Sequence, residues 1–161
     1  MVFKFGGTSV ASPPAIEAVV KIVAAEQGER LVVVSATAGT TDALVKAADQ
    51  AVAGDAAGAQ QTIERLSEQH RNLIADLVGV NGAEALSEIV ELTERTIALL
   101  RSVALLRECS PRSLDAILSY GERVAAPIVA AAFNARGVRA EALSAEGLLI
   151  TDDAFGHANP L

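Results

Sequence analysis

Two short apolar runs near the N-terminus, each followed by small or hydroxyl-bearing residues, constrain the fold most. The first run covers residues 2–5 and leads into Gly6 and Gly7, and the second covers residues 31–34 and leads into a loop over residues 35–41. A run of β-branched residues bounded by turn residues is typical of a fully buried strand in a parallel sheet. A helix between the two runs would complete a right-handed βαβ unit.

The segment between the two runs carries the signals of such a helix. Ser12 is placed as the N-cap, Pro13 suits the first helical position, and Gly28 is placed as the C′ residue. The apolar positions recur at helical spacing, at Ile16, Val19, Val20 and Val23. The sequence therefore predicts an α/β architecture that begins with strand, helix and strand.

Most of the remaining chain has the apolar spacing of amphipathic helices. The pattern predicts helices over residues 42–53, 60–77, 83–107 and 111–137. Ser110 and Pro111 repeat the cap-then-proline signature, and Pro127 should kink or split the last helix. Two further strands are expected over residues 138–143 and 148–151, followed by a tail without recognisable helix or strand.

Composition excludes several classes of function. With 13 Lys and Arg against 20 Asp and Glu, the net charge is −7, and aromatic residues make up 3% of the 161 residues. Such a chain is poorly suited to binding nucleic acid or an anionic membrane surface. It lacks a run of roughly 18 uninterrupted apolar residues and a secretory signal pattern. The single Cys109 fits a reducing cytoplasm.

The first strand leads into a turn with the chemistry of an anion site. Lys4 lies near the carboxyl end of the strand, where ligands bind in open α/β sheets. Gly6 and Gly7 would leave their backbone N–H groups open to a phosphate, while Thr8 and Ser9 add hydroxyl groups. The alternative is an ordinary strand-to-helix turn with a surface lysine.

Two further segments add polar groups. Thr41 opens the helix after the second loop, so its hydroxyl and the helix N-terminus could receive a carboxylate; the alternative is that Thr41 or Thr40 caps the helix. Gly121 inside a helix is expected where another backbone or a ligand comes close. Glu122 beside it could accept a hydrogen bond from an ammonium group, or could simply face solvent.

The other reactive side chains have structural interpretations. His70 lies at helical spacing in an apolar stripe and is expected to be packed. Cys109 has no adjacent histidine base and is expected to behave as a small buried apolar residue. His157 with Asp152 and Asp153 lacks the spacing of a metal site, so no metal site is predicted.

Four motifs together resemble the aspartokinases. They are KFGGTSV at residues 4–10, VSATAGTTD at 34–42, SYGE at 119–122 and TDDAFG at 151–156. They occur in the family's order and cover the whole chain. The resemblance implies an amino-acid-kinase fold, an αβα sandwich, of which residues 1–161 would be the N-terminal half, with a short parallel sheet and a large helical insertion.

The resemblance also implies an activity, its cofactor and its partners. Aspartokinases use ATP with Mg²⁺ to phosphorylate the β-carboxylate of L-aspartate, the first step toward lysine, threonine and methionine. A cytoplasmic enzyme, a possible homo-oligomer, is expected, with L-aspartate and ATP as its small-molecule partners. The roles implied for individual residues are catalysis by Lys4, Gly6 and Gly7, phosphate binding by Lys4, Phe5, Gly6, Gly7, Thr8 and Ser9, and substrate binding by Ser35, Thr41 and Glu122.

The chain is expected to be the aspartate-binding part of such a kinase and inactive alone, because the family's nucleotide-binding lobe and its regulatory ACT domains are absent from it. The alternative is a non-catalytic module that binds aspartate or serves assembly, for example through the helix at residues 83–107. Another kinase of the superfamily, acting on glutamate or acetylglutamate, is disfavoured by the SYGE motif and the long helical insertion.

Overall fold

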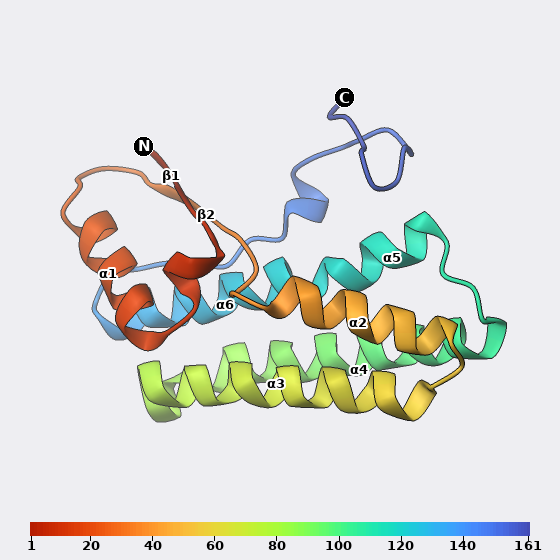
Figure 1. Cartoon of the computed structure of the whole chain (residues 1–161). Helices are drawn as coiled ribbons and strands as arrows, with labels where there is room; N and C mark the ends of the chain where they lie inside the picture. Colours follow the sequence, from red (N-terminus) through yellow and green to blue (C-terminus); the bar gives the residue numbers. More distant parts are fainter.

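The computed structural model describes residues 1–161, with Val80 and Gly147 described by their backbone alone. A two-stranded sheet lies above a thick layer of helices (Figure 1). The chain begins with the strand, helix and strand predicted from the sequence, then runs back and forth through the helical layer and ends in an irregular tail above it.

The sheet is parallel and is covered on one face. Strand β1 (Val2–Phe5) pairs with β2 (Leu31–Val34) so that Val2 lies opposite Leu31 and Phe5 opposite Val34. Alternate residues of both strands pack against the core, whereas Val2 and Leu31 are 68% and 50% exposed. The prediction that the second strand is fully buried was therefore wrong. The helices of this chain cover one face of the sheet, and the side chains of Val2 and Leu31 lie on the other face.

The crossover between the strands is the short 3₁₀ turn η1 (Gly7–Val10) and helix α1 (Pro13–Ala24). Ser12 is the N-cap as predicted, and the predicted apolar stripe is buried. The helix ends earlier than expected, with Ala25 as its C-cap. Gly28 therefore serves the loop before β2, where its φ of +85° requires glycine, and is not the C′ residue.

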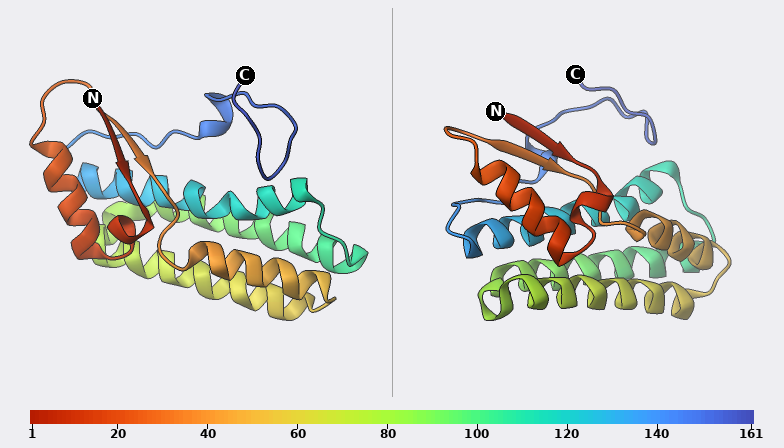
Figure 2. Two further views of the ribbon diagram at one scale, coloured as in Figure 1. Left: turned by 45° about the horizontal axis from the view of Figure 1, so that its top comes forward. Right: turned by 60° about the vertical axis from the view of Figure 1, so that its left-hand side comes forward.

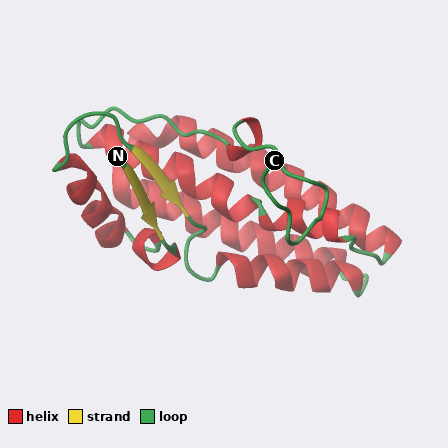
Figure 3. Cartoon of the chain, turned by 90° about the horizontal axis from the view of Figure 1, so that it is seen from above, coloured by secondary structure: helices red, strands yellow, loops and turns green.

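The helical layer follows the predicted periodicity closely. Its members are α2 (Thr40–Val52), α3 (Ala56–Val78), α4 (Ala83–Leu106), α5 (Pro111–Leu118) and α6 (Tyr120–Ala135). Short connections, including the 3₁₀ turn η2 (Gly79–Gly82), make α3 antiparallel to both α2 and α4, as Figure 2 shows. Figure 3 shows the helical layer beneath the two strands. At the start of α5 the Ser110 hydroxyl oxygen accepts a hydrogen bond from the Ser113 N–H at 3.2 Å, which confirms the predicted cap.

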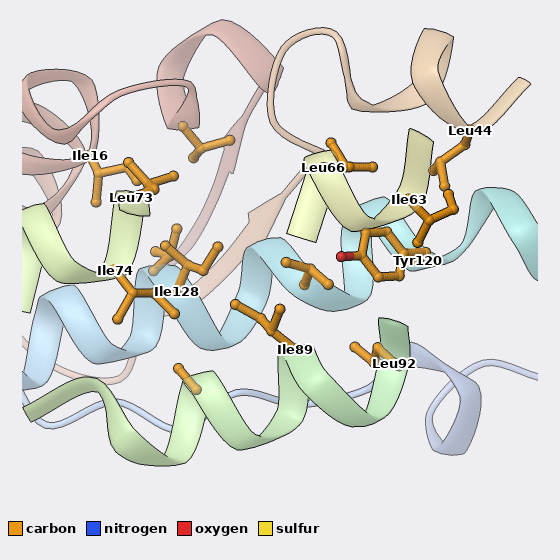
Figure 4. Packing of buried hydrophobic residues seen from close by; sticks show 14 of the residues in the cluster. Ile16, Leu44, Ile63, Leu66, Leu73, Ile74, Ile89, Leu92, Tyr120 and Ile128 are labelled. Atoms are coloured by element: carbon orange, nitrogen blue, oxygen red, sulfur yellow. The ribbon is translucent and has the colours of Figure 1, made fainter. Parts of the chain in front are cut away.

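The main core lies between α3, α4 and α6. Figure 4 shows Ile63, Leu66, Ile89 and Leu92 around the ring of Tyr120, which is only 1% exposed. The Tyr120 hydroxyl lies 3.3 Å from the Thr93 hydroxyl, so its polar end is satisfied inside the core. Burial of this ring raises the pKa of Tyr120.

The last two helices form a nearly continuous rod through the core. The interruption lies at Ser119, between α5 and α6, whereas Pro127 is buried inside α6. The predicted split at Pro127 was therefore wrong in position. The whole stretch Pro111–Ala135 contains a window of mean hydropathy 1.3, enough by length and composition to cross a membrane, but 56% of that window is buried, as in a core helix.

The two strands predicted after α6 are absent from the described backbone. Residues 138–143 are irregular, and residues 148–151 follow the short turn η3 (Ala145–Gly147). The side chain of Asn134 takes both backbone groups of Ala140, with bonds of 3.0 Å to its N–H and 2.9 Å to its carbonyl. A sheet partner would need those same groups, so the local side chain replaces a ladder. Thr151 does form an isolated antiparallel bridge to Pro160.

A buried polar cluster joins the loop after β2 to helix α3. The Thr37 and Thr40 hydroxyls lie 2.7 Å apart, and the Thr37 hydroxyl lies 3.0 Å from Nε2 of His70. His70 is 2% exposed, and burial lowers its pKa from 6.5 to about 4. The packed interpretation of His70 is confirmed, and the ring is neutral near pH 7.

The stability of the fold should depend on pH through His70. The folded pKa is about 4 and the unfolded pKa is 6.5, so the unfolded chain binds more protons between these values. The free energy of unfolding therefore has its full value above pH 6.5 and decreases as the pH falls toward 4. The decrease between pH 7 and pH 5 is about 2 kcal/mol.

Urea denaturation at pH 7 and pH 5 measures this decrease. Between these two pH values the free energy of unfolding of the His70→Leu variant should fall by about 2 kcal/mol less than that of the wild-type chain. A His157→Gln variant serves as the control, since His157 is the other histidine and is exposed. Equal pH dependence in the wild-type and His70→Leu chains would contradict the prediction.

Gly121 should resist enlargement. A Cβ atom there would lie 2.7 Å from the Ala36 Cβ and 2.9 Å from the Thr40 Cγ2, distances at which the helix must shift. Alanine is a better helix former than glycine by about 1 kcal/mol, yet overpacking a well-packed site costs about 1–3 kcal/mol. We expect Gly121→Ala to lower the free energy of unfolding.

Chemical denaturation checks this effect, with Gly6→Ala as the matched control. A Cβ at Gly6 meets nothing within 4 Å, and its φ of −79° suits any residue. A Gly121→Ala variant as stable as the wild-type chain would show that the contact at Ala36 is not tight.

Candidate functional site

The sheet brings the two predicted loops to one edge. Because β1 and β2 are parallel and in register, Gly6 and Ser35 follow directly after the paired residues Phe5 and Val34. The Ser35 N–H continues the ladder by donating to the Phe5 carbonyl at 3.2 Å. Both loops therefore leave the sheet at its carboxyl end, as the sequence predicts.

The first loop packs directly on the second. A Cβ atom at Gly7 would lie 2.6 Å from the Ala36 carbonyl oxygen and 3.6 Å from the Ala38 nitrogen. Only a residue without a side chain fits at that distance from a backbone oxygen. Glycine at position 7 thus has a packing function, in addition to the phosphate-binding function predicted for it.

The start of α6 packs on the same loop from the other side. Gly121 is buried and its position faces the side chains of Ala36 and Thr40. The expected close approach at Gly121 is thus an approach of protein to protein. Ala36, which is 5% exposed and belongs to the second motif, is the residue that the first and third motifs both approach.

The predicted site side chains lie around this contact and are largely accessible. Lys4, Thr8, Thr41 and Glu122 are exposed, while Phe5, Gly6, Gly7, Ser9 and Ser35 are partly buried. The structure brings their backbones together but leaves them on an open face. The described side chains of these residues thus form an open surface.

Two cavities flank this face. One, of about 410 Å³, lies beside the loop after β2 and is lined by Thr37, Ala38 and polar residues of α3 that include His70. The other, of about 290 Å³, lies between α4 and the start of α6 and includes Arg95, Arg123 and Glu146. There Arg123 and Glu146 form an ion pair at 3.2 Å.

Helix α2 begins differently from the prediction. Its N-cap is Gly39, whose φ of +80° is left-handed, and Thr40 is already helical. Neither Thr40 nor Thr41 caps the helix with its side chain. The Thr40 hydroxyl instead turns inward toward Thr37, whereas Thr41 is exposed.

Sequence reasoning missed the Thr37, Thr40 and His70 cluster as a unit. His70 was placed correctly in the apolar stripe of its helix, but its partners lie 33 and 30 residues away. The signal was weak: two threonines in a turn and one histidine among leucines. Pairing them required the packing of α3 against the loop.

The fourth motif docks on α5. The Gly156 N–H donates to the Asp115 carboxylate at 2.7 Å, and the Arg112 guanidinium lies 5.6 Å from the Phe155 ring centroid. Asp152 accepts hydrogen bonds from the side chain and backbone of Asn159 and from the Ala154 N–H, and these bonds lower its pKa. That carboxylate therefore organises the tail's own turn.

Cys109 is half-buried at the junction before α5 and packs against the core. Burial, followed by the negative charge of Asp49, raises the pKa of its thiol. A raised thiol pKa disfavours the nucleophilic thiolate, in agreement with the structural interpretation of this residue.

The chain is similar over nearly its whole length to known aspartokinases. It is 37% identical over 165 residues to chloroplastic aspartokinase 3 of Arabidopsis thaliana, a match that covers 99% of this chain and 28% of that protein. It is 31% identical over 160 residues to lysine-sensitive aspartokinase 3 of Escherichia coli, covering 99% and 34%. The chain thus spans about a third of the length of these relatives.

The structure agrees with the sequence match. Crystalline Escherichia coli aspartokinase III, in complex with aspartate and ADP, superposes with a TM-score of 0.85 at 31% identity over 99% of this chain and 34% of that one. The predicted α/β amino-acid-kinase fold is therefore confirmed. The model of the amino acid kinase family matches residues 1–159. The chain belongs to the amino acid kinase family.

Proposed function

We propose that the chain is the aspartate-binding part of an aspartate kinase. The proposed reaction is ATP-dependent phosphorylation of the β-carboxylate of L-aspartate to 4-phospho-L-aspartate, in the cytoplasm, at the head of lysine, threonine and methionine synthesis. The observation that carries the proposal is the meeting of three motifs at Ala36. Similarity to an aspartokinase that binds aspartate and ADP supports the choice of substrates.

The turn after β1 suits a transferring phosphoryl group. Lys4 extends an exposed ammonium group near the carboxyl end of the strand, and space is open at Gly6 because a Cβ there meets nothing within 4 Å. Backbone N–H groups of Gly6 and Gly7, with the hydroxyls of Thr8 and Ser9, complete the proposed donor set. Phosphoryl transfer requires mainly positioning and charge stabilisation, and this set supplies both.

ATP with Mg²⁺ would supply the phosphoryl group at this turn. The residues that would hold its phosphates are Lys4, Phe5, Gly6, Gly7, Thr8 and Ser9. The open space at Gly6 and the positive charge of Lys4 fit an anionic oxygen. This chain corresponds to about a third of the length of its relatives. We propose that in those relatives the remaining two thirds supply the rest of the nucleotide site.

The other two motifs suit a dicarboxylic amino acid. The exposed Glu122 carboxylate would accept hydrogen bonds from the substrate ammonium, and the hydroxyls of Ser35 and Thr41 would donate to a substrate carboxylate. Gly121 places Glu122 beside the loop that carries Ser35. In this arrangement the β-carboxylate of the substrate faces the turn after β1, where the phosphoryl group arrives.

The chain should bind L-aspartate, and Glu122→Gln should weaken that binding. Loss of a hydrogen bond to a charged group costs about 1.5–3 kcal/mol, which corresponds to roughly a 10- to 150-fold rise in Kd. Isothermal titration calorimetry with the 161-residue chain measures the change. The control is Glu88→Gln, an exposed glutamate on α4, which should leave Kd unchanged.

An ADP-release assay together with aspartate titration separates the kinase from the alternative. ADP release that depends on both ATP and aspartate, from the polypeptide that contains these residues, supports the kinase. Aspartate binding with no response to ATP in that polypeptide identifies a non-catalytic aspartate-binding module. Absence of aspartate binding contradicts both.

In a complete kinase polypeptide that contains these residues, Lys4→Ala should abolish phosphoryl transfer and leave the fold intact. Loss of one group that stabilises transition-state charge lowers kcat by about 100- to 1000-fold. Lys4 is exposed, so the free energy of unfolding should change by less than about 0.5 kcal/mol. Lys46→Ala, at an exposed position on α2, is the matched control. Activity of the Lys4→Ala variant near the wild-type rate would overturn the role of Lys4.

A further inference from the structure

The loop between β2 and α2, residues 35–39, is the element on which the proposed aspartate site is built. It carries Ser35 and leads directly to Thr41 at the start of α2. It is closed on itself by a backbone bond from the Thr40 N–H to the Thr37 carbonyl at 3.1 Å and by the contact between the two hydroxyls at 2.7 Å. These bonds shape the turn, but they do not hold it against another element.

His70 adds a hydrogen-bonded attachment to α3, beside the packing of Gly7 and Gly121 on Ala36. Its Nε2 lies 3.0 Å from the Thr37 hydroxyl and 3.5 Å from the Thr40 hydroxyl, so one ring nitrogen reaches both sides of the turn. The residue sits in the middle of α3, where Leu66 and Leu73 one turn away on either side are also buried. A side chain on a rigid, packed helix thereby fixes a loop that otherwise faces solvent at Ala38 and Gly39.

The imidazole ring of His70 is hydrogen-bonded through Nε2 alone in the described part of the chain. Nδ1 of His70 is buried without a hydrogen-bond partner in the described part of the chain, and the nearest aromatic ring is that of Tyr120, with centroids 6.0 Å apart. A buried N–H without a partner is rarer in proteins than an unpaired acceptor. The ring proton is therefore assigned to Nε2, which donates to the Thr37 hydroxyl, and the Thr37 hydroxyl donates to Thr40.

We propose that His70 is a positioning residue: through Thr37 and Thr40 its Nε2 holds the loop in the arrangement in which Ser35 and Thr41 receive aspartate. The inference rests on the proposed function for its ligand. In this role His70 acts on the substrate through the hydroxyls of Thr37 and Thr40 and makes no contact with the substrate itself. Its loss should weaken aspartate binding by freeing the loop, and loss of the Thr37 hydroxyl should do the same by the same route.

A double-mutant cycle on L-aspartate binding tests this route. We expect His70→Leu and Thr37→Val each to raise Kd about tenfold, and the double variant to raise it no further than either single change, because both break one connection. His70→Gln, whose amide N–H can still donate, should stay within about threefold of the wild-type Kd. Thr96→Val is the control, since the hydroxyl of the buried Thr96 bonds the Leu92 carbonyl of its own helix.

Hydrogen exchange reads the loop without any ligand. The Thr40 amide donates to the Thr37 backbone carbonyl, and in Thr37→Val and His70→Leu chains it should exchange about tenfold faster. The exchange rate of the Leu44 amide, inside α2, should stay unchanged. Leu44 also reports whether a variant is folded. If His70→Leu fails this check, the Thr37→Val chain decides.

The outcomes separate this inference from the proposed function. Wild-type binding of aspartate with unchanged Kd in both single variants overturns the positioning role and leaves the proposed function standing. Additive effects of the two changes also overturn it. If the wild-type chain binds no aspartate, the proposed function fails, and the Thr40 amide alone decides whether His70 holds the loop; unchanged exchange there overturns that claim.

Discussion

The site depends on one close approach, that of two glycines to Ala36. At Gly7 any side chain would meet the Ala36 carbonyl oxygen at 2.6 Å, and at Gly121 it would meet the Ala36 methyl group at 2.7 Å. The loop after β2 is thereby enclosed between the turn after β1 and the start of α6. A side chain at either position would force the elements apart, because protein interiors transmit such displacements instead of absorbing them.

The helical layer serves this contact as a platform. Helix α3 packs against α2, α4 and α6, and it also carries the histidine that reaches the loop. Tyr120, at the start of α6, is anchored in the core while its neighbours Gly121 and Glu122 face the loop and solvent. One buried ring thus fixes the first turn of the helix that presents a proposed substrate ligand. The accessible face of the site rests on the most completely buried part of the molecule.

Periodicity was a good guide wherever local spacing decides structure. The predicted helices at residues 42–53 and 83–107 differ from α2 and α4 by at most two residues at any end, because their apolar stripes and punctuating glycines act within a few turns. The strand predicted at 138–143 failed, because a strand exists only beside a partner, and Asn134 binds the backbone of Ala140 instead. In the strand predicted at 148–151 only Thr151 pairs, through its isolated bridge to Pro160. The predicted roles of Gly28 as a C′ residue and of Pro127 as the point of a split failed for a similar reason. The segments packed around a helix decide where it ends and whether it tolerates a proline.

The amino-acid sequence by itself determined the order of the elements, the chemistry of the loops and the family resemblance, because these depend on residue types and on spacing along the chain. Tertiary structure decided which groups meet. The hydrogen bond between Thr37 and His70 spans 33 positions, and Ala36 touches glycines from two different motifs. Such contacts depend on how helices pack in three dimensions, and no local pattern encodes the distance between side chains that lie so far apart in the chain.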